Sequence, residues 1–307
     1  MKDKICYVIN FYFGERRKTI EKYTNEDRLF FYKKQIELLE KYSHSLSKII
    51  FTCNIEKDDY KYVSELFKIT PKDIQGAEVE LHFRENHGLS YAAWSDSFDR
   101  NEDKYDYFIF NEDDYFFIQD NWDRYLLNKF NSYNDCGFVC AAIREPHHWN
   151  DYKKHAGHSA SISSNKVLKE IKTKSGSLPH GNKKDYDSNQ KLGQINQTFS
   201  SLELGYNVYD IRDDFRVSFA WTEDDGIDIW RMFWWNKKDL IVPAMLIETL
   251  PYNWYGCLDL EFQLGYKPTT GKEAMYCYND KLPYCDNGYD ENGEFTGWVR
   301  KEYPENI

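Results

Sequence analysis

The chain has 307 residues, enough to bury a sizeable core in one large domain or in a domain with an appendage. A hydrophobic content of 41% indicates a globular rather than a disordered protein. The formal net charge of -11, with Lys and Arg spread along the chain, argues against nucleic acid as the main partner, because phosphate contacts need clustered basic residues.

The cysteines and the amino-terminal segment indicate in which cellular compartment the protein is expected. Seven cysteines, an odd number with no Cys-x-x-Cys pair, indicate neither a disulfide framework nor a zinc site and favour a reducing environment. The first apolar segment ends at Gly14 without a cleavage signal of small residues, so we read it as a strand. No run approaches the roughly 18 apolar residues of a membrane span. We therefore expect a soluble, cytoplasmic protein, with peripheral contact to a membrane surface left open.

The predicted elements of the first part of the chain alternate between strands and helices. Their order is strand 5–13, helix 29–42, strand 48–55, helix 60–67, strand 77–83, helix 89–100 and strand 105–118. This alternation predicts the α/β class, with a parallel sheet covered by helices.

The second part of the chain is less regular. In order, the pattern predicts a helix around 122–130, a strand at 137–143, a polar loop at 144–158, a short helix near 167–171, a helix from Leu192 to Gly205 with Leu192, Ile195, Phe199 and Leu202 as its apolar stripe, and a strand at 207–211. The last residues show little periodicity and many Gly, Tyr and Pro. We expect a main domain at 1–240 and an irregular carboxyl-terminal extension, 241–307, packed on it.

The acidic triplet Glu112-Asp113-Asp114 is the most informative motif, because it directly follows an apolar run. Three like charges beside a buried strand repel one another and lose solvation, which favours a cation between them. Hard oxygen ligands suit Mg²⁺ or Mn²⁺, which complete their shell with water and substrate phosphates. Along a strand, Glu112 and Asp114 would share a face unless the chain turns there. A solvated acidic turn is the alternative.

Three polar strand ends are expected to meet at the carboxyl edge of the sheet, where open parallel sheets bind ligands. They are residues 10–17, 84–90 and 111–114. Together they bring arginines, Gly-containing turns and carboxylates to one cleft. Such a cleft suits a nucleoside diphosphate with a divalent cation, whose charge compensates the leaving diphosphate.

These features resemble the glycosyltransferases of the GT-A fold, those of family 2 in particular. The resemblance covers roughly residues 3–215 and depends on the strand order, on the segment from Asn86 to Ser90 before Ala92 and Ala93, and on the acidic triplet as a variant of the family's Asp-x-Asp motif. It implies a mixed, mostly parallel sheet flanked by helices, with a donor half at about 1–118 and an acceptor half at about 119–240. It also implies transfer of a hexosyl or pentosyl group from a UDP- or GDP-type sugar donor to a hydroxyl of a glycan acceptor, with Mn²⁺ or Mg²⁺.

The resemblance further implies roles for single residues. Asp114, the last acid, would bind the metal, and Glu112 is the second candidate ligand. The donor-binding candidates are Asn10, Phe11, Tyr12, Arg84, Asn86, Gly88, Ser90, Glu112 and Asp113. Asp185 and Asp187 are candidate bases for an inverting reaction, whereas a retaining enzyme does not require such a base. The acceptor-binding candidates are His158, Trp149 and Trp221.

Simpler explanations stay open for several of these residues. Phe11 fits a core position, and Arg84 fits a surface ion pair with Glu85 or another acid. Gly88 fits an ordinary turn at a helix start. The histidines in 147–158 have no familiar zinc spacing.

Other functions also stay open. A sugar-phosphate nucleotidyltransferase shares the parallel sheet and the metal-bound acids, but normally carries a Gly-rich loop with Arg and Lys after the first strand, where this chain has only Gly14. A glycoside hydrolase would use two carboxylates without nucleotide or metal. A non-catalytic carbohydrate-binding protein would use the tryptophans in 230–235.

Overall fold

The structure is a computed structural model, and the residues that it describes are 3–14, 27–117, 120–144, 155–182, 189–210, 217–219, 285–289 and 295–300. The chain divides into two compact units, one of residues 1–15 and 26–211 and the other of residues 16–25 and 212–307. In the second unit, the described strands are β10 (Val217–Phe219), β11 (Cys285–Tyr289) and β12 (Phe295–Arg300). β11 and β12 pair antiparallel within the predicted extension, while the boundary at residue 240 stays a prediction.

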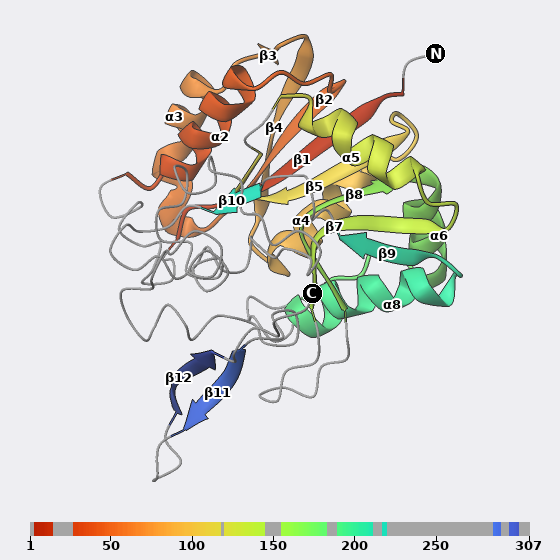
Figure 1. The fold of residues 1–307 in the computed structure, drawn as a ribbon. Helices are drawn as coiled ribbons and strands as arrows, with labels where there is room; N and C mark the ends of the chain where they lie inside the picture. Colours follow the sequence, from red (N-terminus) through yellow and green to blue (C-terminus); the bar gives the residue numbers. More distant parts are fainter. Residues whose placement is uncertain are drawn as a thin grey trace. The chain divides into compact units, whose positions relative to one another are not determined.

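The first unit is built on an eight-stranded sheet with the order β3-β4-β2-β1-β5-β8-β7-β9 (Figure 1). Its strands are β1 (Ile5–Tyr12), β2 (Lys48–Ile55), β3 (Asp73–Ile74), β4 (Ala77–Glu85), β5 (Tyr107–Glu112), β7 (Cys136–Arg144), β8 (His155–Ser164) and β9 (Asn207–Asp210). β3 and β8 run antiparallel to their neighbours, and the other pairs are parallel. The predicted class, a mixed and mostly parallel α/β sheet, is confirmed.

Helices flank this sheet on both faces. They are α2 (Phe30–Lys41), α3 (Tyr60–Ile69) with the short η1 (Lys57–Asp59) before it, α4 (Leu89–Asp99), α5 (Trp122–Asn131), α6 (Asn165–Ser175) and α8 (Asn196–Glu203) with the π-helical segment η2 (Asn189–Ile195) before it. In the part of the chain that the structure describes, every helix is too short or too polar to cross a membrane.

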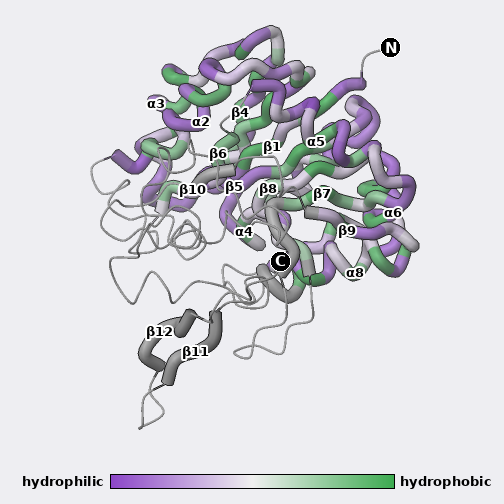
Figure 2. Tube along the Cα trace, viewed as in Figure 1, coloured by the Kyte–Doolittle hydropathy of each residue, from purple (hydrophilic) through white to green (hydrophobic). Residues whose placement is uncertain are grey.

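The side chains of β1 show which helices pack on which face of the sheet, because successive side chains of a strand face opposite sides. Tyr7 packs edge-on against Trp122 of α5, with 4.9 Å between ring centroids, and Phe11 packs against Tyr32 of α2 at 4.6 Å. Val8 instead joins a core cluster on the opposite face, whose other members include residues of α4 and α6. Figure 2 shows β1 as one of the apolar strands at the centre of the unit.

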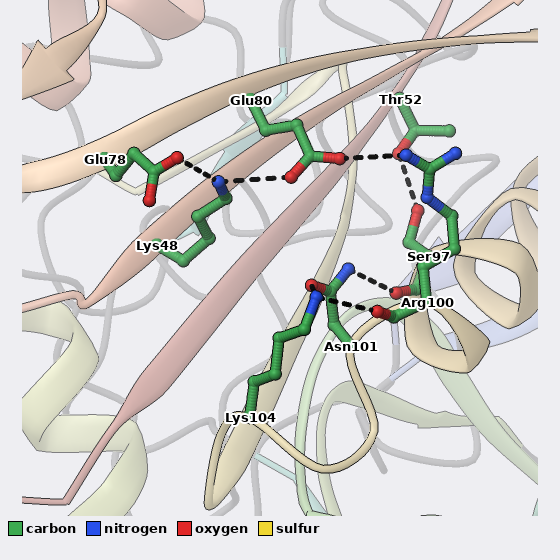
Figure 3. Close-up of polar contacts among 8 residues, drawn as sticks. All are labelled: Lys48, Thr52, Glu78, Glu80, Ser97, Arg100, Asn101 and Lys104. Carbon is green, nitrogen blue, oxygen red and sulfur yellow. Dashed lines mark hydrogen bonds and ion pairs between the residues drawn. The ribbon is translucent and has the colours of Figure 1, made fainter.

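A buried lysine marks the amino-terminal edge of the sheet (Figure 3). Nζ of Lys48 lies 2.8 Å from Oε1 of Glu78 and 3.1 Å from Oε2 of Glu80, and Arg100 reaches Glu80 at 3.3 Å. Burial alone lowers the pKa of Lys48, but its hydrogen bonds to the two glutamates outweigh burial and raise that pKa. The amine therefore stays charged, and it anchors the edge opposite to the predicted ligand-binding edge.

Two predictions for the second part of the chain are wrong. The polar loop predicted at 144–158 is wrong from residue 155 on, where β8 begins and enters the sheet between β5 and β7. The apolar stripe predicted for the helix from Leu192 is also wrong, since Leu192 and Leu202 are exposed. The buried residues of α8 are instead polar: Gln197, Thr198 and Ser201.

Candidate functional site

The acidic triplet lies in a turn. β5 ends at Glu112, Asp113 and Asp114 form the turn, and β6 (Tyr115–Phe117) follows at once. The strand predicted at 105–118 is therefore interrupted at the triplet, and strand alternation does not set the directions of the three carboxylates. Asp113 is buried, whereas Glu112 and Asp114 are half-buried and keep access to solvent.

Two buried amides hold this turn in place. Nε2 of Gln35, on α2, donates to the carbonyl oxygens of Asp113 and Tyr115 at 2.8 and 2.7 Å. Nδ2 of Asn111 donates to the carbonyl oxygens of Glu112 and Tyr115 at 2.7 and 2.8 Å. Because the carbonyls of Glu112, Asp113 and Tyr115 are all hydrogen-bonded to buried side chains, the turn has a defined conformation.

The carboxylates of Glu112 and Asp113 have different partners. Oε1 of Glu112 accepts a hydrogen bond from Oγ of Ser90, in the first turn of α4, at 2.6 Å. Oδ2 of Asp113 accepts from the backbone N–H of Tyr12, at the end of β1, at 3.0 Å. Asp113 therefore connects the ends of β5 and β1, whereas Glu112 connects β5 to α4. The structure thus brings together four of the predicted site residues.

Arg84, at the end of β4, is the centre of a buried hydrogen-bond network. Its Nε donates to Oδ2 of Asp96 at 2.6 Å, and its Nη1 donates to Oδ1 of Asn54 at 2.6 Å. Its Nη2 lies 2.9 Å from Nε2 of His87 and donates to the His87 carbonyl oxygen at 3.1 Å. The simpler explanation of an ion pair is therefore met by another acid than Glu85, namely Asp96 of α4, although the guanidinium is buried rather than on the surface.

The network continues from Asn54 to Asn10 across the sheet. Nδ2 of Asn54, near the end of β2, donates to Oδ1 of Asn10 on β1 at 2.8 Å, and both side chains are buried. Thr52, two residues before Asn54 and so on the same face, shares a hydroxyl hydrogen bond of 2.8 Å with Ser97 of α4 (Figure 3). The polar ends of β1 and β2 therefore lie on the face that α4 covers.

The segment before α4 includes two further predicted residues. Asn86 is buried, and its Nδ2 donates to Oε1 of Glu56 at 2.8 Å, while its Oδ1 has no partner among the described residues. Gly88 caps α4 with φ of 64°, and a Cβ added to it would lie 2.0 Å from the carbonyl oxygen of Gly181. Both the backbone conformation and the close approach of the chain therefore require glycine at 88.

The other predicted residues of β1 and β8 lie deeper. Phe11 packs in the core, and Tyr12 beside it is half-buried. His158 is fully buried, with Nδ1 3.2 Å from Sγ of Cys140 and Nε2 3.1 Å from Oγ1 of Thr198. It connects β8 to β7 and α8. Contact between this ring and an acceptor stays a prediction.

Four predicted residues lie outside the described part of the chain. They are the candidate bases Asp185 and Asp187 and the candidate acceptor residues Trp149 and Trp221.

The side chains at the turn fit the divalent cation that the resemblance implies. Glu112 and Asp114 offer hard carboxylate oxygens at half-buried positions. No group of three His, Cys, Asp or Glu side chains that could hold a metal ion occurs among the described residues. Mg²⁺ or Mn²⁺ would therefore be bound by one or two carboxylates, with water and substrate phosphate oxygens completing the shell, as Mg²⁺ usually is.

The residues of the site that were not predicted include Gln35, Asn54, Glu56 and Asp96. Asn54 lies next to the last residue of β2, so the rule that located the other strand ends applies to it equally. Gln35 and Asp96 lie within helices, and no local pattern distinguishes them from solvent-facing residues.

Comparison with known proteins supplies no family for the chain. No protein-family model matches it, and no curated protein matches it significantly in sequence. Among solved structures, the mannosyltransferase PcManGT from Pyrobaculum calidifontis, in complex with GDP-Man and Mn²⁺, is 9% identical with a TM-score of 0.44, and the match covers 69% of this chain and 56% of that one. Glucosyl-3-phosphoglycerate synthase from Mycobacterium tuberculosis, in complex with Mg²⁺ and UDP, is 13% identical with a TM-score of 0.36 and 68% coverage of each chain.

A third match is of another activity. A cytidylyltransferase from Leptospira borgpetersenii is 12% identical with a TM-score of 0.41, over 70% of this chain and 77% of that one. With TM-scores below 0.5, these likenesses establish neither the activity nor the family of this chain.

Proposed function

We propose that the protein is a metal-dependent glycosyltransferase that moves a hexosyl or pentosyl group from a nucleoside-diphosphate sugar to a hydroxyl of a glycan acceptor. The observation that carries the proposal is the acidic turn at Glu112-Asp113-Asp114, fixed at the carboxyl end of β5 by Gln35 and Asn111. Ligands of open parallel sheets bind at this edge.

The surroundings of the turn support a phosphate-bearing ligand. α4 begins directly after the carboxyl end of β4, so its amino-terminal N–H groups lie at this edge. Asp114 is the proposed metal ligand, with Glu112 beside it. When bound, the cation supplies charge compensation for the leaving diphosphate. Asn10, Tyr12 and Asn86 are proposed to line the nucleoside part of the site.

The acceptor side of the proposal concerns the half at 119–240. Asp185 and Asp187 are the candidate bases, on the condition that the reaction inverts the sugar configuration. Trp149 and Trp221 are proposed to contact the glycan. His158, with both ring nitrogens hydrogen-bonded inside the unit, is proposed to act by holding β8 and α8 in place beside the acceptor.

The proposal is tested by binding and turnover together. Isothermal titration with UDP, GDP, CDP and ADP, each with and without Mn²⁺, should give metal-dependent binding of at least one nucleotide. Asp114→Ala should weaken that binding at least about tenfold by removing a metal ligand. The matched control is Asp103→Ala, since Asp103 lies in the turn before β5 and forms an exposed pair with Lys169.

Turnover distinguishes the transferase from its rivals. Release of nucleoside diphosphate from a sugar donor, dependent on an acceptor glycan, is the expected result. Pyrophosphate release from a nucleoside triphosphate and a sugar phosphate would instead assign a nucleotidyltransferase. Binding of no nucleotide under any of these conditions would contradict both assignments.

A further inference from the structure

The strand β4 has an outer side that its neighbour β3 covers only in part. The pairing with β3 includes Ala77 and Glu78, and beyond it the N–H of Val79 donates to the Lys72 carbonyl oxygen at 2.9 Å. The residue before Lys72 is Pro71, which has no N–H to extend this pairing. From residue 80 on, the described part of the chain contains no strand that pairs with the outer side of β4.

The backbone groups that point outward from β4 can be identified. Along a strand, the N–H and C=O groups of successive residues point alternately to the two sides. The Val79 N–H points outward, and β4 pairs with β2 without a shift from Glu78 to Glu85, so the groups of Leu81 and Phe83 point outward as well. Neither residue has a backbone hydrogen bond on this side within the described ranges. Each therefore offers one donor and one acceptor to a further strand.

This edge lacks the features that usually protect an exposed strand. Such strands are commonly interrupted by proline, lysine or a bulge. The sequence of β4 is AEVELHFRE, without Pro or Lys, and its pairing with β2 has no bulge. Sheet edges of this kind readily pair with another chain.

An apolar surface on α3 borders the edge. The Phe83 ring lies 5.4 Å from the ring of Phe67, on α3, and Phe67 is 64% exposed. Tyr60, two turns earlier on the same helix face, is 70% exposed. Phe67 and Tyr60 are the two most exposed of the large hydrophobic residues in the described part of the chain. The open backbone and the exposed rings are therefore parts of one surface.

Two copies of β4 fit each other in an antiparallel register with the two-fold axis at His82. This register places Leu81 of each copy opposite Phe83 of the other. Each of these two pairs exchanges two hydrogen bonds, so the outward groups of both residues are all used. An axis at Leu81 would instead require the Val79 N–H, which already donates to Lys72.

The same register matches charges on the other face of β4. Glu80 of each copy lies opposite Arg84 of the other, and opposite charges at facing positions are favourable. Axes at Glu80 or at Arg84 would place like charges opposite each other. Glu80 pairs with Arg100 of α4 (Figure 3), and Arg84 pairs with Asp96 of the same helix. Because both side chains already have partners, the match selects the register more than it adds affinity.

We propose that the protein forms a homodimer in which β4 pairs antiparallel with β4 of a second copy, about a two-fold axis at His82. The two eight-stranded sheets then join into one continuous sheet. Such an interface is self-complementary, as in most homodimers. The proposal goes beyond the proposed function and does not depend on it.

The variant His82→Cys tests the register. At the axis, the two cysteines occupy a pair without hydrogen bonds, whose Cα atoms lie about 4.5 Å apart, within the range of a disulfide. Mild oxidation should convert most of this variant into a covalent dimer on a non-reducing gel. The matched control is Glu80→Cys on the same face of β4, because its cysteine faces Arg84 and not itself. The wild type measures the background from the seven native cysteines.

The variant Leu81→Pro tests the backbone pairing. Sedimentation of the wild type at tens of micromolar should give twice the 36.8 kDa of one chain. Proline at 81 removes an outward N–H that has no partner in the monomer, and edge strands accept proline at such positions. Leu81→Pro should therefore sediment as a monomer. Leu81→Ala is the matched control, because it shortens the side chain but keeps the N–H, and it should remain a dimer.

The possible outcomes decide for or against the dimer. A monomeric wild type, as expected if another segment of the chain covers β4, would overturn the proposal. A dimer that persists in Leu81→Pro would also overturn it, and so would equal cross-linking of the two cysteine variants. If Leu81→Pro does not fold, the comparison of His82→Cys with Glu80→Cys decides. Failure of every nucleotide to bind contradicts the proposed function and leaves the dimer unaffected.

Discussion

Ser90 and Glu112 connect a helix and a strand that are separate in sequence: the Ser90 hydroxyl, in the first turn of α4, donates to Oε1 of Glu112 at the end of β5 at 2.6 Å. Because hydrogen bonds to charged groups are the stronger ones, this contact fixes a carboxylate that would otherwise be repelled by its acidic neighbours. We therefore expect the Ser90 hydroxyl to contribute to the stability of the fold.

Ser90→Ala should lower the free energy of unfolding by about 1 kcal/mol, since it removes one hydrogen bond from a half-buried carboxylate. Urea denaturation monitored by circular dichroism measures the change. Ser90→Thr keeps a hydroxyl and should lose less. Equal losses in the two variants would show that packing, not the hydrogen bond, is responsible.

Asp113 should tolerate an amide but not an alanine. Asp113→Asn keeps an oxygen that accepts from the Tyr12 N–H, whereas Asp113→Ala removes this acceptor from a buried position. We expect Asp113→Ala to cost about 1–3 kcal/mol of unfolding free energy and Asp113→Asn clearly less. Thermal and urea unfolding of the pair provide the measurement. A similar cost for both would mean that the negative charge, not the accepted hydrogen bond, stabilises this turn.

Gly88 can be tested against Gly76, because both have a positive φ, of 64° and 87°. An alanine at either position suffers the left-handed conformation, which costs about 1–2 kcal/mol. At 88 the added Cβ also meets the Gly181 carbonyl oxygen, whereas at 76 nothing lies within 4 Å. Gly88→Ala should therefore lower the free energy of unfolding by at least about 1 kcal/mol more than Gly76→Ala does. Equal costs in urea unfolding would contradict the close approach.

The pair of Tyr209 and Asp135 should give a defined pH dependence. The Tyr209 hydroxyl donates to Oδ1 of Asp135 at 2.7 Å, which raises the pKa of Tyr209 to about 12 and lowers the pKa of Asp135 below its ordinary value of 3.8. Because the pKa of Tyr209 is higher in the folded state than in the unfolded state, where it is near 10, the protonated hydroxyl stabilises the fold below pH 10. This contribution is lost as the pH rises towards 12. The lowered pKa of Asp135 contributes above about 3.8 and is lost as the pH falls below that value.

The midpoint of unfolding of the wild type, relative to Tyr209→Phe, should therefore be highest between these limits. We expect the difference to shrink from pH 10 upwards and again below pH 4. Since other tyrosines also titrate at high pH, only the difference between the two proteins is informative. A difference that stays constant from pH 7 to pH 12 would contradict the hydrogen bond.

Much of the fold follows from local patterns, and the exceptions have a common cause. β1, β2 and β5 follow apolar runs that are buried on both faces, so their positions are readable from sequence. β8 was missed because its sequence, from His155 to Ser164, is mostly small and polar. Its polar side chains are buried through hydrogen bonds formed only in the folded unit, such as that of Ser163 Oγ to the Gly137 carbonyl oxygen at 2.6 Å.

The candidate site shows the same division. Strand ends could be located because parallel strands place them at one edge, which applies to Asn10, Arg84 and the triplet. The partners of these residues could not be predicted, because they come from other elements. Asp96 of α4 binds Arg84, although Glu85 is its neighbour in sequence. The conformation of the turn at Asp113 likewise depends on hydrogen bonds from Gln35, which lies on α2, far away in the sequence.

The acidic turn is closed by Gln35 across separations of 78 and 80 residues. Bringing such distant segments together costs loop-closure entropy, which only the packing of the intervening strands and helices can offset. The turn is therefore held by contacts that exist only when α2 and β5 are packed in the same folded unit. A synthetic peptide of residues 105–117 lacks Gln35 and would therefore carry the three carboxylates without the side chain that closes the turn.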